Sequence, residues 1–256
     1  DNDTAGFELG TGSLVLVEGE NDTISVRLTG RPISNVVISS SLHANFDSRA
    51  TLANNVLTFT SANWNTEQFI PVTASQDLLV NGSVGPHPIT FEIVQADSAD
   101  AFDGLANQTA SLTVQDNDTA GMSVVPPPLG SLLADGNVLV SETGGEDELE
   151  IQLSGQPTHD VVITITGVDA TEFTVSKTSL TFTSLNWNNK QTLRFKGLPD
   201  NLTDGDITTT ITLTAASSDS SFNGVSTTVD VTNLDTRPAG GFTNPCQLIS
   251  MDYSIN

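Results

Sequence analysis

The sequence has little cysteine, few basic residues and no long apolar run. Its single cysteine, Cys246, excludes an intrachain disulfide and leaves two interpretations, an inert small hydrophobe or a bridge between chains. No stretch approaches the ~18 consecutive apolar residues of a membrane helix, and no signal peptide is visible. With 8 Lys+Arg against 31 Asp+Glu, the net charge of −23 repels nucleic-acid phosphates and anionic membranes. We therefore expect neither nucleic-acid binding nor membrane insertion.

Residue patterns typical of catalysis are also missing. His43, His87 and His159 are isolated in the sequence, and no G-x-S-x-G elbow or glycine-rich phosphate loop occurs. Paired carboxylates do occur, but a chain this acidic produces such pairs by chance. The sequence therefore predicts a protein that is not an enzyme. The acidic surplus itself has two interpretations, solubility of a Ser/Thr-rich surface or binding of divalent cations.

A long internal repeat is the most informative feature that is present. The segment LTFTSANWN at 57–65 returns as LTFTSLNWN at 180–188, and these segments hold both tryptophans. Other landmarks recur in the same order, among them TGRP and SGQP, each followed by a Val-Val-Ile run, and FDG and FNG. The period of about 120 residues is too long for a solenoid unit and long enough for a separate core. We therefore predict domains at 1–118 and 119–235, with a tail at 236–256.

Within each copy, apolar and polar residues alternate with period two and turn-forming residues intervene. Ile24, Val26 and Leu28, for example, share one face of a predicted strand. Seven such strands per copy predict an all-β chain of two antiparallel β-sandwiches. Trp64 and Trp187 are predicted to plug the cores, with a ligand-stacking platform as the alternative. The chain opens on the Asp-Asn-Asp tripeptide that also joins the copies, so we expect it to begin at a repeat boundary, either cut from a longer array or after removal of a leader.

The ordered landmarks resemble Calx-beta-type repeats of extracellular surface and adhesin proteins. The shared pattern is L-T-F-T-x-x-N-W-N, a D-x-x-x-[ND]-G loop, F-[DN]-G and a closing D-N-D, over roughly residues 1–235. The resemblance implies tandem immunoglobulin-like β-sandwiches, Ca²⁺ bound near end loops and domain junctions, an extracellular structural or adhesive role, and no catalysis.

The positions that match the pattern give a set of candidate Ca²⁺ ligands. They are the acid after the first strand, the loop acids and the closing acids of each copy: Glu18, Asp77, Asp116, Asp118, Glu142, Asp200, Asp204, Asp206 and Asp235. Ca²⁺ takes six to eight oxygens, so a site must gather several of these groups. The copies differ where Asn81 replaces Asp204 and where copy two closes on a single acid. The alternative is that the Asp residues only form turns.

Six N-x-S/T sequons are candidate glycosylation sites, which would make the protein a glycoprotein if its source has the machinery. They lie in predicted turns and linkers: Asn2, Asn21, Asn81, Asn107, Asn117 and Asn201.

Residues 236–256 begin like a third copy and then match neither, so they are either the start of a third repeat or a spare strand, best placed at 247–255. Since sandwich edges accept strands from neighbouring molecules, we expect a homopolymer that assembles head-to-tail by β-strand addition. The donor is either this strand or the segment at 7–17. Two alternatives stay open: a Ca²⁺-rigidified stalk fragment of a large adhesin, and a carbohydrate- or receptor-binding module.

Overall fold

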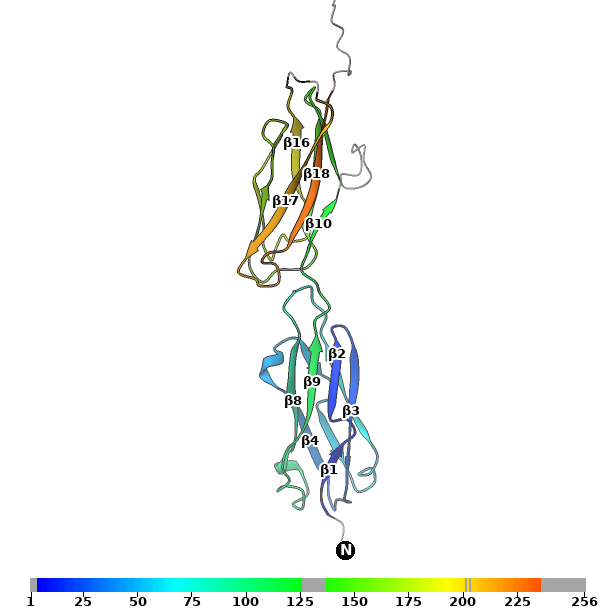
Figure 1. Cartoon of the computed structure of the whole chain (residues 1–256). Helices are drawn as coiled ribbons and strands as arrows, with labels where there is room; N and C mark the ends of the chain where they lie inside the picture. Colours follow the sequence, from blue (N-terminus) through cyan, green and yellow to red (C-terminus); the bar gives the residue numbers. More distant parts are fainter. Residues whose placement is uncertain (1–3, 126–136, 201, 203, 236–256) are drawn as a thin grey trace, which may run out of the picture. The chain divides into compact units, whose positions relative to one another are not determined.

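The computed structural model describes residues 4–125, 137–200, 202 and 204–235. Contacts divide the chain into two compact units, Asp1–Thr119 and Ala120–Asn256. Each unit is an immunoglobulin-like β-sandwich (Figure 1), so the predicted fold class is confirmed. The predicted donor strand at 247–255 and Cys246 lie outside the described residues. Across the part that is described, no helix is long and apolar enough to cross a membrane.

The described part of unit 1 contains nine strands in two sheets, ordered β1-β3-β7-β5 and β2-β9-β8-β4-β6. Short 3₁₀ helices lie at Ala44–Phe46 and Gln95–Asp97. The strands are β1 (Phe7–Leu9), β2 (Ser13–Val17), β3 (Asn21–Leu28), β4 (Val36–Leu42), β5 (Ala50–Leu52), β6 (Val56–Phe59), β7 (Gln68–Ala74), β8 (Val84–Ile93) and β9 (Gln108–Gln115).

The described part of unit 2 repeats this topology, with sheets ordered β10-β12-β16-β14 and β11-β18-β17-β13-β15. Its strands are β10 (Met122–Val125), β11 (Val138–Ser141), β12 (Glu146–Leu153), β13 (Val161–Thr166), β14 (Phe173–Val175), β15 (Ser179–Phe182), β16 (Gln191–Gly197), β17 (Ile207–Ser217) and β18 (Ser226–Leu234). In both units one early strand pairs in parallel with the last strand, β2 with β9 and β11 with β18, while the other pairings are antiparallel.

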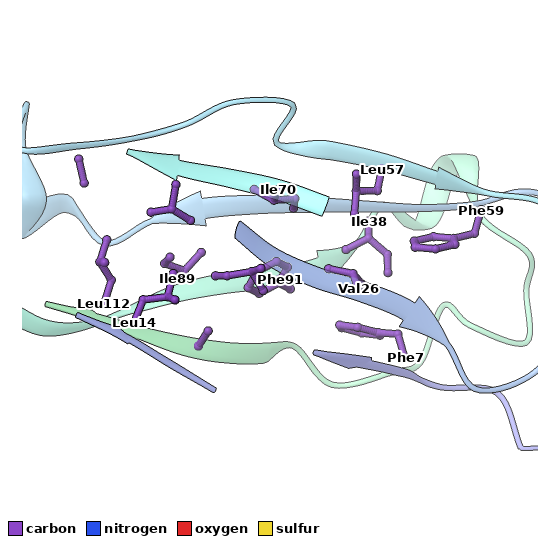
Figure 2. Close-up of a cluster of buried hydrophobic side chains, with 14 of the residues drawn as sticks. Phe7, Leu14, Val26, Ile38, Leu57, Phe59, Ile70, Ile89, Phe91 and Leu112 are labelled. Atoms are coloured by element: carbon purple, nitrogen blue, oxygen red, sulfur yellow. The ribbon is translucent and has the colours of Figure 1, made fainter. Parts of the chain in front are cut away.

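The core of unit 1 lies between its two sheets and is built by the alternation predicted from sequence. Ile24, Val26 and Leu28 of β3 are at most 2% exposed and face β4, β8 and β9 residues across the sandwich. Figure 2 shows Val26, Ile38, Ile70 and Phe91 meeting in this interior. Full burial of one such side chain contributes about 1.5–3 kcal/mol, so this layer is the main source of stability.

The tryptophans only partly fit their predicted role. Trp64 is half-buried and packs against the unit 1 core from its edge, and Trp187 is half-buried at the same place in unit 2. Their backbone carbonyls accept hydrogen bonds from Leu28 and Leu153, both at 2.9 Å. Each tryptophan therefore closes the edge of a core while leaving part of its side chain accessible.

Candidate functional site

The loops of unit 1 bring three predicted ligands together, Glu18, Asp77 and Asp118. Each offers one carboxylate oxygen, and these oxygens lie within 4.8 Å of one another. The backbone explains how: β2 and β9 run in parallel and end side by side at Val17 and Gln115, so the residues that follow them leave the sheet together. The loop after β7 adds Asp77, whose Oδ1 accepts from the Leu79 amide at 2.8 Å.

Glu18 is the buried member of the unit 1 cluster. It is 3% exposed, and its Oε1 accepts from Arg49 Nη2 at 2.9 Å, whereas its Oε2 is buried without a hydrogen-bond partner. Burial raises the pKa of Glu18 and outweighs the hydrogen bond from Arg49, which lowers it. A buried carboxylate oxygen with no donor is costly, and a cation would satisfy it.

Asp118 holds the second unsatisfied oxygen of the unit 1 cluster. Its Oδ2 is buried without a partner, and burial together with the charges of Asp116 and Asp77 raises its pKa. The like charges in this cluster therefore favour neutralisation by a bound proton or a bound cation.

Asp116 is a predicted ligand that instead organises the loops. Its Oδ2 accepts from the backbone amides of Asn81 at 2.9 Å and Gly82 at 2.6 Å, and its Oδ1 accepts from the Asp118 amide at 2.8 Å. Gly82 has a φ of 71°, a conformation that glycine adopts without strain. Asp116 thus ties the β7–β8 loop to the segment that holds Asp118.

Unit 2 assembles an equivalent cluster from Glu142, Asp200 and Asp204, again with ligand atoms within 4.8 Å of one another. Glu142 is 8% exposed and donates its amide to Leu234, as Glu18 does to Gln115. Asp200 Oδ1 accepts from the Leu202 amide at 2.7 Å, which repeats the Asp77 geometry. The other predicted ligands of unit 2 position backbone: Asp235 accepts from the Gly205 amide, and Asp206 accepts from the Asp235 amide.

These contacts align the closing segments of the two units. Asp116 and Asp235 both accept from the glycine amide of the preceding loop, so they are equivalent, and the position of Asp118 corresponds to residue 237, outside the described residues. Asn81 of unit 1 aligns with Asp204 of unit 2. Each unit therefore keeps three carboxylates, with the third supplied by the closing segment in unit 1 and by the loop in unit 2.

Arg49 is the site residue that sequence reasoning missed. The amide of Ser75 donates to the Arg49 carbonyl, and the amide of Leu198 donates to the Glu172 carbonyl, so these two residues are equivalent. The Arg49 side chain is 13% exposed, and its Nη1 also donates to the Gly82 carbonyl at 2.5 Å. Unit 1 therefore neutralises part of its cluster internally, while unit 2 has an acid at the equivalent position.

The sequons occupy mixed environments. Asn21, Asn81, Asn107 and Asn117 are exposed, and Asn2 and Asn201 lie outside the described residues. Asn117 Nδ2 donates to the Glu18 carbonyl at 3.3 Å and to Gln76 Oε1 at 3.1 Å. A glycan on that nitrogen would disturb both contacts beside the cluster.

The histidines do not form a catalytic constellation in the described residues. His43 and His87 stack at 4.7 Å between ring centroids, and Phe46 packs edge-on against His87. His159 Nδ1 lies 3.1 Å from the hydroxyl of Thr158.

Comparison with known proteins places the chain by fold alone. No protein-family model matches the chain, and no curated protein matches it. Among solved structures, CBD12 from CALX1.2 is similar at TM-score 0.34 and 13% identity, covering 89% of this chain and 98% of that one. The apo-form Calx CBD1 domain is similar at TM-score 0.33 and 21% identity, covering 46% of this chain and 99% of that one. The periplasmic chaperone SfaE is similar at TM-score 0.31 and 12% identity, covering 90% of this chain and 100% of that one. At these TM-scores and identities the matches carry no inference about family or function, and the β-sandwich fold is given by the strand order itself.

Proposed function

We propose that the chain is a non-catalytic, extracellular structural module whose two sandwiches each bind a divalent cation, with Ca²⁺ as the best chemical fit. One observation carries the proposal: each of the two compact units brings three carboxylates to the same place in its sandwich, although the third acid comes from a different segment in each.

The donor set fits a hard cation. Carboxylate oxygens are the ligands that Ca²⁺ prefers, and three carboxylates supply up to six of the six to eight oxygens that it takes. In the unit 1 cluster, Glu18 and Asp118 each have a buried carboxylate oxygen without a hydrogen-bond partner, and Arg49 is the cation that pairs with Glu18. A bound ion would tie together the segments after β2, β7 and β9, which stiffens that end of the sandwich.

Calcium-dependent stability tests this proposal in the full chain. Calorimetric unfolding in Ca²⁺ and in chelator is expected to show a higher Tm with Ca²⁺, because a ligand that binds only the folded state stabilises it. The double variant Glu18→Gln, Asp200→Asn should lose the difference. The matched control Asp22→Asn alters an exposed acid outside both clusters. Equal Tm values in Ca²⁺ and chelator would contradict the proposal.

A second function, homopolymerisation by β-strand addition, is favoured by a difference between the two units. In β11 the backbone amide of Leu139 donates a hydrogen bond to Asp147 Oδ2 at 2.9 Å, so it already has a partner within the unit. The equivalent residue in β2, Val15, is 57% exposed. The Glu18 amide donates to the Gln115 carbonyl, and the Gly12 carbonyl accepts from the Ser111 amide, so both residues direct their backbone groups toward β9. Because this direction alternates along a strand, the backbone amide and carbonyl of Val15 point away from β9, toward the open edge of the sheet. We propose this edge as the acceptor.

The structure supports a C-terminal over an N-terminal donor. Phe7–Leu9 and Ser13–Val17 already pair with β3 and β9 of their own unit, so donating them would break native ladders. Electron microscopy of the full chain is therefore expected to show filaments, and deleting residues 237–256 is expected to abolish them. Filaments that survive the deletion would sink the C-terminal donor, and filaments that survive Val15→Pro would sink the β2 acceptor.

A further inference from the structure

The outer face of the β3–β7 pair in unit 1 has an unusual surface for this chain. Between the register pairs Asn21↔Thr73 and Ser25↔Phe69 its outward side chains are uncharged, and we call these six residues the neutral face: Asn21, Thr23, Ser25, Phe69, Pro71 and Thr73. Phe69 is 52% exposed among them. The other nine phenylalanines among the described residues are buried, so an exposed phenylalanine ring is exceptional for this chain.

Unit 2 provides an internal control for this face. The pairs Ser25↔Phe69 of unit 1 and Glu150↔Thr192 of unit 2 hold equivalent register positions. Where unit 1 has Thr23, Asn21, Pro71 and Thr73, unit 2 has Glu148, Glu146, Arg194 and Lys196. Three ion pairs cross that face, Lys190–Glu150 at 2.7 Å, Lys196–Glu146 at 3.4 Å and Arg194–Glu148 at 3.5 Å. The six equivalent positions are therefore mostly charged in unit 2 and uncharged, with an exposed ring, in unit 1.

A pocket continues the neutral face at one end. It has a volume of about 370 Å³, and its walls come from β1, β3 and the loop before β7: Glu8, Arg27, Leu28, Thr29, Trp64 and Asn65. Arg27 Nε donates to Glu8 Oε1 across the β1–β3 pair. Since Ser25 lies opposite Phe69, Arg27 is the diagonal neighbour of Phe69 on the same face. The equivalents of Arg27 and Glu8 in unit 2 are Gln152 and Ser123.

We propose that the neutral face and this pocket form a binding site for a neutral polysaccharide. The Phe69 ring presents a flat apolar surface for the C–H face of a sugar ring, and the half-buried Trp64 indole provides a second in the pocket. Arg27, Glu8 and Asn65 are planar donors and acceptors for sugar hydroxyls. The net charge of −23 opposes anionic polymers. A sheet face with small hydroxyl side chains gives an extended chain room to lie flat.

The site is independent of the cation clusters, because it shares no residue with them. Sugar binding is therefore expected to persist in chelator and in the Glu18→Gln, Asp200→Asn variant. Failure of the cation proposal would leave this one standing, and the reverse also holds.

The test uses the full chain with Trp187→Phe, so that Trp64 alone reports by fluorescence. The probes are neutral oligosaccharides of glucose, mannose and galactose, with polygalacturonate as the charged comparison. At least one neutral probe is expected to shift the Trp64 emission, and polygalacturonate is not. Phe69→Thr, which installs the residue of unit 2, should weaken binding by about tenfold or more. Because Phe69 is exposed, the Tm of the Phe69→Thr variant should stay close to that of the parent.

Arg27→Gln should weaken binding similarly, while the matched change Arg194→Gln on the charged face of unit 2 should leave the affinity unchanged. Absence of binding by every neutral probe at millimolar concentration would overturn the proposal, as would an affinity unaffected by Phe69→Thr. If Phe69→Thr instead dissociates an oligomer in sedimentation velocity, the face is a self-interface and the sugar proposal is wrong.

Discussion

At the scale of single residues, the buried pair Glu18–Arg49 dominates the chemistry of unit 1. Its geometry leaves Glu18 Oε2 and Arg49 Nε without partners, so the pair is only partly compensated. Breaking a buried pair by removing one partner costs about 3–5 kcal/mol, because the other charge stays buried.

Arg49→Gln is therefore expected to lower the unfolding free energy of unit 1 by about 3 kcal/mol in chelator. The same change removes a positive charge from the cation site, so Ca²⁺ should stabilise the variant more than it stabilises the parent. Paired thermal melts in Ca²⁺ and chelator measure both effects. A variant that gains no more from Ca²⁺ than the parent would show that Arg49 does not oppose the cation.

The raised pKa values of Glu18 and Asp118 give a pH dependence with a defined sign. A carboxyl whose pKa is raised in the folded state holds more protons when folded than when unfolded. The contribution of that carboxyl to folding stability therefore falls as the pH rises from the ordinary pKa of the group, 4.5 for Glu18, through its raised pKa in the folded state. In chelator, Glu18→Gln should flatten this decline. A parallel pH profile for variant and parent would contradict the assignment.

At the scale of strands, one glutamine in each unit links the two sheets of its own sandwich and occupies a backbone carbonyl of an edge strand. Gln68 Nε2 donates to the Thr58 carbonyl at 2.9 Å, and Gln191 Nε2 donates to the Thr181 carbonyl at 2.7 Å. Each bond links β7 or β16 to the edge strand of the opposite sheet, where an open carbonyl would invite a foreign strand.

Gln68→Ala and Gln191→Ala should each cost about 1 kcal/mol of stability and should increase association, because they free an edge carbonyl. Chemical denaturation and light scattering measure the two effects. Loss of stability without any rise in association would show that the glutamines act only within the fold.

Sequence alternation was sufficient for the long strands and insufficient for the short ones. The predicted strand that contains Ile24, Val26 and Leu28 occurs as β3, Asn21–Leu28. The three-residue strands Phe7–Leu9 and Ala50–Leu52 were missed, because three residues are too few to display a period. Such strands exist through pairing with β3 and β7, which is tertiary information.

The candidate sites show the same division. The repeat identified Glu18, Asp77 and Asp200, since they lie at matched landmarks. It did not align the closing acids, because only the hydrogen bonds of Gly82 and Gly205 establish that Asp116 matches Asp235. Arg49 was invisible for a similar reason: it lies 31 residues from Glu18 in sequence.

At the scale of the whole molecule, two units share one topology and divide their surface chemistry. Unit 1 has an internal guanidinium at its cluster and the six uncharged residues of the neutral face, and unit 2 has an acid and three ion pairs at the equivalent places. Coulomb attraction to a divalent ion is stronger without the nearby positive charge, so unit 2 is expected to bind Ca²⁺ more tightly than unit 1.

Titration calorimetry of the full chain with Ca²⁺ tests the central claim most directly. We predict two binding events of unequal affinity. Glu18→Gln should remove the weaker event and Asp200→Asn the tighter one, each leaving the other intact. No heat of binding in the parent, or a single event unaffected by either variant, would contradict the account.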